Sequence, residues 1–244
     1  NNIAIWQTNK LIPKWDLQGR FIMDGSDSKH DWKEKLPIDH QPHSLNPSRG
    51  YLSSANQNPV DSGYPYFVPG DYAPLFRGSR IDQILEETHS ATYKDLQEIQ
   101  NDNKSLLAKR VVPLLLEILD KDQLSADQTE IFDHLLNWDY FYNPDSKMPG
   151  LFDLWIKKIS TSTWKDELGN ADEDVEWPNF RVLSDLIAED PNNKWFDNIN
   201  TSQTENFSTL AIDAFETISK KLLSELGSVG DKWKWKNFRG TDVY

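Results

Sequence analysis

The sequence predicts an α+β fold, in which a first third of short strands and loops precedes a mainly helical remainder. The run Asn2–Thr8 predicts a strand, with Ile3 and Ile5 on one face and Trp6 on the other. A second short strand is expected over Tyr51–Ala55. The segment from 13 to 47 is rich in Pro, Gly, Asp and Trp, and it predicts irregular connections with short strands near Arg20–Met23.

The residues after Arg77 carry helical patterns instead, because apolar side chains recur every three or four positions. Ser125 and Gln128 have the spacing of a capping box, and Ser202 with Glu205 is expected to cap the last long helix, which stops at Gly227. An acidic stretch, Trp164–Pro178, is expected to be a loop. Helices are predicted over Arg80–Glu87, Thr92–Gln100, Lys104–Leu119 with a kink at Pro113, a segment ending near Trp138, Leu151–Ser160, Asn179–Ala188 and the segment before Gly227.

Composition excludes several classes of function. The chain has 244 residues, a net charge of −13 and no cysteine. The negative charge argues against nucleic-acid or anionic-membrane partners, and without cysteine there can be no disulfide, thiolate nucleophile or cysteine zinc site. No apolar run approaches the ~20 residues that span a bilayer. Because neither an initiator methionine nor a signal peptide precedes Asn1, we expect a processed chain or a piece of a longer one.

The strongest pattern lies in the stretch 46–77, where a turn and a short strand lead into an irregular loop and then a helix. A loop that follows a rigid strand is a common place for binding and catalytic groups. The stretch resembles the β-chain of the penicillin amidase family, N-terminal-nucleophile hydrolases that include penicillin acylases and acyl-homoserine-lactone acylases. The matching residues are Asn46-Pro47, Gly50-Tyr51, Ser54-Ala55-Asn56, Tyr64-Pro65-Tyr66-Phe67, Arg77 and Ile81, with Asp31-Trp32-Lys33 and Leu36-Pro37 upstream and Arg80-Ile81-Asp82 downstream.

The resemblance implies a fold and two site residues. The strand-and-loop part would belong to a four-layer αββα sandwich, with segment 1–76 in its core, 77–230 as a mainly helical region and 231–244 starting a return to the sheet, for which Lys232–Tyr244 is expected as a strand. Asn56 would donate its side-chain amide to the oxyanion of the tetrahedral intermediate. Arg77 would organise the surroundings of the nucleophile. Without the resemblance, Asn56 would be a turn residue and Arg77 a surface arginine.

The nucleophile implied by the resemblance is the hydroxyl of an N-terminal Ser, with its free α-amino group as the base. Position one is Asn, so we expect the nucleophile to lie outside this chain, and the chain alone to be inactive. The expected partners are the remaining β-chain and the α-chain of one precursor, which in this family is exported to the periplasm and cut autocatalytically. The expected substrate is a small N-acyl amide of the penicillin or acyl-homoserine-lactone type.

Metal signals are weak, and the chemistry implied by the resemblance needs no cofactor. Some family members bind a structural calcium partly through an Asp after the Tyr-Pro pair, for which Asp71 is the nearby candidate. His40 and His43 beside Asp39, and the acidic turn 24–27, are interpreted as ordinary loops. An aromatic cluster either lines an acyl pocket or packs a loop onto its domain, the latter for most members: Tyr64, Tyr66, Phe67, Tyr72 and Phe76.

Two alternatives to the acylase remain open. The chain could be an acidic, aromatic-rich interaction module that kept the family scaffold and lost its activity. It could also be a structural helical domain unrelated to the family, although this does not account for the first eighty residues, which are poor in helix signals.

Overall fold

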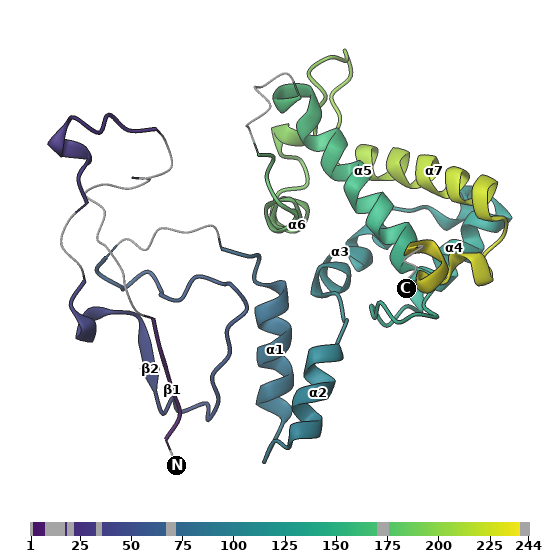
Figure 1. Ribbon diagram of the computed structural model, residues 1–244. Helices are drawn as coiled ribbons and strands as arrows, with labels where there is room; N and C mark the ends of the chain where they lie inside the picture. Colours follow the sequence, from purple (N-terminus) through teal and green to yellow (C-terminus); the bar gives the residue numbers. More distant parts are fainter. Residues whose placement is uncertain are drawn as a thin grey trace. The chain divides into compact units, whose positions relative to one another are not determined.

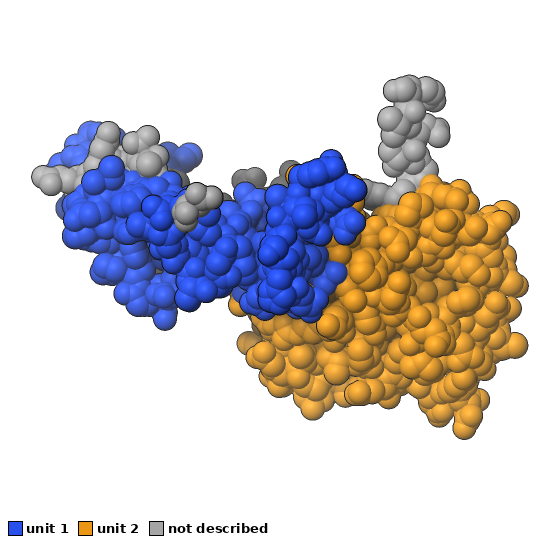
Figure 2. Space-filling model, turned by 90° about the horizontal axis from the view of Figure 1, so that it is seen from below, with its two compact units in different colours: residues 1–99 blue, residues 100–244 orange. Residues whose placement is uncertain are grey.

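The computed structural model describes residues 2–7, 18, 22–32, 36–66, 72–169 and 176–239. The chain divides into two compact units, Asn1–Ile99 and Gln100–Tyr244, which are coloured separately in Figure 2. The described residues are mostly helical with one small sheet, so the α+β class is confirmed at this level. The site residues predicted from the sequence, Asn56 and Arg77, both lie in the first unit.

The sheet of unit 1 has two antiparallel strands, β1 (Ala4–Trp6) and β2 (His43–Leu45), which run side by side in Figure 1. Ile5 pairs with Ser44 and Trp6 with His43. β1 falls within the predicted strand 2–8, whereas β2 lies in the segment that was expected to be irregular. Apolar residues of both strands, Ile5, Trp6 and Leu45, are exposed.

The strand predicted over Tyr51–Ala55 does not form. Its polar groups bond instead to α1 (Phe76–Glu87): the Ser53 hydroxyl donates to Asp82 at 2.5 Å, and the Tyr51 hydroxyl reaches the Asp82 carbonyl at 3.4 Å. The helices α1 and α2 (Tyr93–Asn101) lie where the periodicity predicts them. Two single-turn 3-10 helices, η1 (Ser28–His30) and η2 (Ile38–His40), connect the loops before β2.

Unit 2 is built from packed helices. The capping box of Ser125 and Gln128 and the stop at Gly227, which has a positive φ of 79°, are both confirmed. Beyond α2 the helices are α3 (Leu106–Glu117), α4 (Ala126–Leu136), α5 (Pro149–Leu168), α6 (Phe180–Glu189), α7 (Phe207–Leu226) and α8 (Trp235–Arg239), with 3-10 turns η3 (Lys121–Gln123), η4 (Lys194–Phe196) and η5 (Asp231–Trp233).

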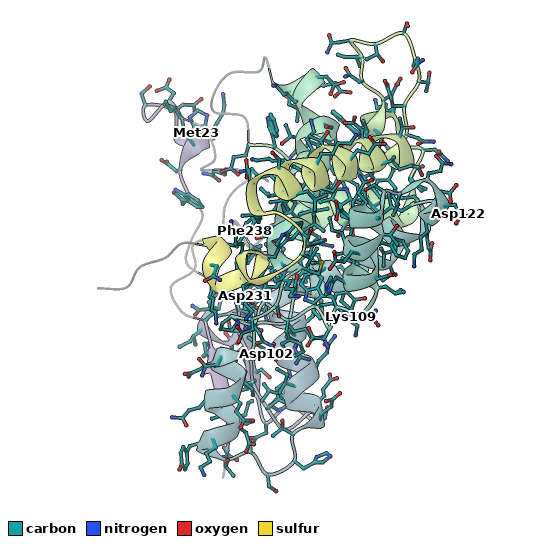
Figure 3. All side chains as sticks on the ribbon, turned by 90° about the vertical axis from the view of Figure 1, so that its right-hand side faces the viewer. Met23, Asp102, Lys109, Asp122, Asp231 and Phe238 are labelled. Carbon is teal, nitrogen blue, oxygen red and sulfur yellow. The ribbon has the colours of Figure 1, made fainter. Side chains whose placement is uncertain are left out.

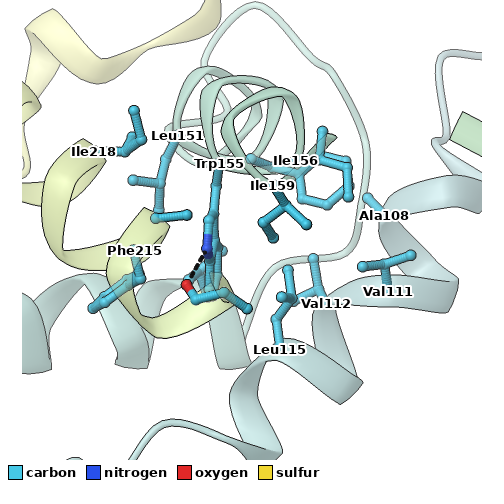
Figure 4. Packing of buried hydrophobic residues seen from close by; sticks show 14 of the residues in the cluster. Ala108, Val111, Val112, Leu115, Leu151, Trp155, Ile156, Ile159, Phe215 and Ile218 are labelled. Carbon is cyan, nitrogen blue, oxygen red and sulfur yellow. Dashed lines mark hydrogen bonds between the residues drawn. The ribbon is translucent and has the colours of Figure 1, made fainter. Parts of the chain in front are cut away.

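The core of unit 2 is centred on α5 and α7. Trp155 of α5 is fully buried against Phe215 of α7, and its indole N–H donates to the Ala211 carbonyl at 2.8 Å, as the dashed line in Figure 4 marks. Leu151 and Ile159, one turn before and one turn after Trp155, are buried beside it. This dry, interlocked contact positions the two longest helices against each other.

Three local predictions in unit 2 were wrong. Residues 164–168, expected as loop, continue α5 because Trp164 is buried in the core and holds the last turn there. The cap of α7 is Asn206, whose side chain accepts the Thr209 N–H, while Glu205 bonds to the preceding loop. Residues 232–239 of the expected C-terminal strand instead belong to η5 and α8 and the residue between them; Asp231 at the start of η5 and Phe238 of α8 are labelled in Figure 3. None of the helices in the described ranges is long and apolar enough to cross a membrane.

Candidate active site

Asn56 sits at a sharp turn of the backbone. Its φ of 63° lies in the left-handed region, where asparagine is one of the few side-chain-bearing residues found with any frequency. The Ala73 N–H donates to the Asn56 carbonyl at 2.8 Å and so ties the turn to the residues just before α1. Ala55 is buried, whereas the Asn56 side chain is exposed. The turn therefore has a fixed base and presents its amide outward.

Arg77 binds this turn from the first turn of α1. Its Nη2 donates to the Asn56 Oδ1 at 2.6 Å and to the Ala55 carbonyl at 3.0 Å. A cation near the N-terminus of a helix is disfavoured by the helix dipole by about 0.3–1 kcal/mol. The two hydrogen bonds offset this cost and give the position a structural reason to be arginine.

The contact fixes which way the Asn56 amide faces. A guanidinium has donors only, so the atom that meets Arg77 must be the amide oxygen. The Nδ2 amino group, with its two donors, is then directed away from Arg77. Because the acceptor is bonded to a full positive charge, the amide is polarised and its N–H groups become stronger donors. The pair can thus present a fixed, neutral donor to an oxygen that gains negative charge.

The backbone that leads into the turn is tied to the same helix. Asp82 of α1 accepts from Ser53 and lies 3.5 Å from the Arg49 guanidinium, which also stacks over the Tyr51 ring. Consequently α1 contacts residues on both sides of Ala55, and the position of Asn56 depends on this one helix.

A cleft of about 600 Å³ opens beside Asn56 within unit 1. Its walls come from β1, β2 and the segment 49–59, and they combine apolar and hydroxyl side chains. Trp6 forms one wall, where its indole stacks on His43 with ring centroids 4.1 Å apart. Among the other lining residues are Ile5, Leu52, Ser53, Pro59 and Tyr72. A hollow of about 660 Å³ in unit 2 contains none of the predicted site residues.

The aromatic cluster is only partly covered by the described residues, since Phe67 lies outside them. Tyr64 donates to the His40 carbonyl at 2.7 Å, and the Tyr66 hydroxyl lies 2.7 Å from Nδ1 of His40. These bonds pack the loop onto η2, whereas Tyr72 lines the cleft beside Asn56. The cluster is therefore divided between loop packing and the cleft wall.

The structure does not bring the candidate metal ligands together. His40 bonds to Tyr66 and His43 stacks on Trp6, while the Asp24 carboxylate accepts the Ser26 backbone and hydroxyl hydrogens, which lowers the pKa of Asp24. Among the described residues, no group of three or more His, Cys, Asp or Glu side chains could hold a metal ion. Asp71, the calcium candidate, lies outside the described residues.

Comparison with known proteins identifies the family. The model of the family described as Penicillin amidase matches residues 1–243. The chain belongs to the penicillin amidase family. This confirms the resemblance that the residues of 46–77 indicated.

Individual relatives agree with this assignment. The acyl-homoserine lactone acylase QuiP of Pseudomonas aeruginosa is 23% identical over 94% of this chain and 29% of the relative. QuiP of Pseudomonas fluorescens is 20% identical, with 94% of this chain and 31% of the relative covered. The chain thus spans about a third or less of the curated relatives it matches.

A solved structure shares the fold. A thermostable penicillin G acylase from Alcaligenes faecalis aligns with 100% of this chain and 50% of its own chain, with a TM-score of 0.63 and 17% identity. At this identity the likeness shows a common fold, and the chemistry has to be argued from the residues.

Proposed function

We propose that this chain is part of an acylase that hydrolyses an N-acyl amide bond, with Asn56 as one donor of its oxyanion hole. The observation that carries the proposal is the Arg77–Asn56 hydrogen bond, because it leaves the Asn56 amino group as the outward-facing donor. Family membership supports the reaction class, and the acylase names of the relatives support an N-acyl amide substrate, of the penicillin or acyl-homoserine-lactone type.

The proposed mechanism divides the work between this chain and the rest of the protein. A Ser hydroxyl at an N-terminus outside this chain attacks the amide carbonyl, and its own α-amino group takes the hydroxyl proton. The C–N bond then breaks, the amine leaves with that proton, and water hydrolyses the acyl-enzyme to release the carboxylic acid. As the tetrahedral intermediate forms, the carbonyl oxygen becomes negative, and Nδ2 of Asn56 donates to it. Arg77 acts by positioning Asn56. A donor held in place in this way raises kcat by a factor of about 10²–10³.

The remaining parts of the proposal concern the complete protein, because this chain spans about a third or less of its curated relatives. The small sheet of unit 1 would be completed by further strands into the αββα sandwich, supplied by the remaining β-chain and the α-chain of one precursor. The exposed Ile5, Trp6 and Leu45 support this, because apolar strand faces of this kind are usually covered. The complete protein would act in the periplasm, and this chain alone would be inactive.

The test uses the complete protein and two variants of Asn56. Asn56→Asp keeps a residue that tolerates a positive φ and strengthens the contact with Arg77, but it has no N–H to donate. Asn56→Gly keeps the backbone and removes the whole amide. We expect both to lower kcat for N-acyl amides by about 10²–10³ while the protein folds normally.

The matched control is Asn179→Asp, which makes the same change at an exposed position of unit 2, where the side-chain oxygen accepts the Arg181 N–H and can still do so as a carboxylate. Unchanged kcat in the Asn56 variants would overturn the oxyanion role. A complete protein with no activity on a panel of N-acyl amides would instead favour the inactive interaction module.

A further inference from the structure

Gln57, the residue after Asn56, contacts the backbone on the other side of Asn56. The Gln57 side chain folds back so that its Oε1 accepts the backbone N–H of Ala55 at 2.5 Å. Ala55 is buried, and a buried N–H without an acceptor is costly. The bond between Gln57 and Ala55 thus spans Asn56, the residue between them. The N–H of Ala55 is bound by Gln57, and its carbonyl is bound by Arg77.

The Gln57 amide faces α1. Gly78, a buried residue in the first turn of α1, has no side chain, and a Cβ at this position would lie 3.5 Å from Cδ and Oε1 of Gln57. This is an ordinary contact distance, so the amide faces Gly78 across a space that a methyl group would fill. The first turn of α1 thus binds the Asn56 side chain through Arg77 and faces the Gln57 amide at Gly78.

From these contacts we infer that Gln57 is a positioning residue for Asn56. The inference rests on the proposed oxyanion role of Asn56. The left-handed conformation of Asn56 is held by three bonds: from Ala73 to its carbonyl, from Arg77 to its side chain, and from Ala55 to Gln57. The bond to Gln57 sets the direction of the Ser54–Ala55 peptide, next to the Ala55–Asn56 peptide whose carbonyl Arg77 binds. Without it the peptide turns more freely, and the donor spends less time at the oxyanion.

Loss of the Gln57 contact should slow the chemical step and leave substrate binding nearly unchanged, because the oxyanion exists only in the transition state and the intermediate. In the complete protein, we expect Gln57→Met, which fills similar space without an acceptor, to lower kcat about tenfold and to change KM less than about twofold. Gln203→Met, the same change at an exposed position of unit 2, serves as the control and leaves kcat unchanged.

A double-mutant cycle separates positioning from general damage. If Gln57 acts through Asn56, Gln57→Met has almost no further effect on kcat in an Asn56→Gly background. If Gln57→Met lowers kcat by the same factor in both backgrounds, or has no effect in the native background, the inference is wrong. Where Gln57→Met does not accumulate as a folded protein, Gln57→Ala takes its place in the same cycle.

The same cycle distinguishes failure of this inference from failure of the proposed function. An Asn56→Gly protein with native kcat would overturn the oxyanion role, and the inference with it. A strong loss in Asn56→Gly together with no loss in Gln57→Met would leave the oxyanion role intact and overturn only the role of Gln57.

Discussion

The two units differ in what holds them together. The buried apolar cluster of the described residues lies entirely in unit 2, whereas unit 1 contributes only Leu36 and Ala55 to the buried hydrophobic residues. Unit 1 instead relies on hydrogen bonds, the Arg49–Asp82 ion pair and a two-stranded sheet. The candidate active site lies in the unit with the weaker core, so its geometry depends on local polar contacts rather than on packing.

Hydrogen exchange should show the largest contrast. Amide hydrogens of α5 and α7 exchange only when the core of unit 2 unfolds, which costs about 5–15 kcal/mol. The hydrogen bonds of loop amides can open at close to zero cost. In the 244-residue chain we expect amides of 43–60 to exchange several orders of magnitude faster than those of α5 and α7. Mass spectrometry of peptides from both units measures this. Equal protection would show that unit 1 has a core of its own.

Truncating one tryptophan in each unit sharpens the contrast. Trp155→Ala removes a fully buried ring and its bond to Ala211, and we expect it to cost about 3–5 kcal/mol in the free energy of unfolding. Trp6→Ala removes a ring that is 44% exposed, and it should change the unfolding of the helices by less than about 0.5 kcal/mol. Urea unfolding followed by circular dichroism at the helix signal compares them. Similar losses would contradict the division.

A smaller effect is expected at a helix end of unit 2. The Ser125 hydroxyl oxygen accepts the Gln128 N–H, and the Ser125 backbone N–H donates to the Gln128 side chain in return, so Ser125→Ala leaves the Gln128 N–H without its acceptor. We expect a loss of about 1 kcal/mol. Ser224→Ala, at an exposed position inside α7, should be neutral or slightly stabilising because alanine is the better helix former. If both variants have the same stability, the cap contributes nothing.

The smallest effect concerns pH. Burial, assisted by the neighbouring Asp166 carboxylate, raises the pKa of Glu167 from its ordinary value of 4.5 to about 7. The folded chain therefore keeps a proton there that the unfolded chain releases, so this contribution to stability is complete below pH 4.5 and lost as the pH rises through 7.

Replacing Glu167 by an uncharged residue tests this. Glu167→Gln should reduce the fall in melting temperature between pH 4.5 and 7, whereas the exposed Glu225→Gln should leave that fall as in the native chain. The difference is expected to be modest, because the side chain is only partly buried. Identical pH profiles for all three proteins would exclude Glu167 as the cause.

The sequence predicted most where the signal is local. Period, caps and breakers located α1, α2, α4 and α6, and the motif around Asn56 identified the family. The structure also places Asn56 and Arg77 in contact, although their roles stay predictions. Residues 164–168 and 232–239 were mispredicted because tertiary burial of Trp164 and Trp233 outweighed acidic and alternating patterns.

Gln57 shows why a site is harder to predict than a helix. Its contact with Ala55 depends on a side chain that reverses direction and faces a glycine twenty-one residues later in the chain, Gly78. Nothing in the local composition distinguishes it from an ordinary loop glutamine. The strand β2 was missed for a similar reason, because its partner β1 lies far away in the sequence.

The pairing of β1 with β2 also has a consequence for how the chain emerges during synthesis. Unit 1 leaves the ribosome first, yet its two strands are distant in sequence and bury little apolar surface when they meet. Unit 2 is made later, and its helices also pack across large separations in sequence, but they bury a large apolar cluster when they meet. We therefore expect the half made second to gain its stability first, so that the segment bearing Asn56, although made earlier, stays open to chaperones and proteases for longer.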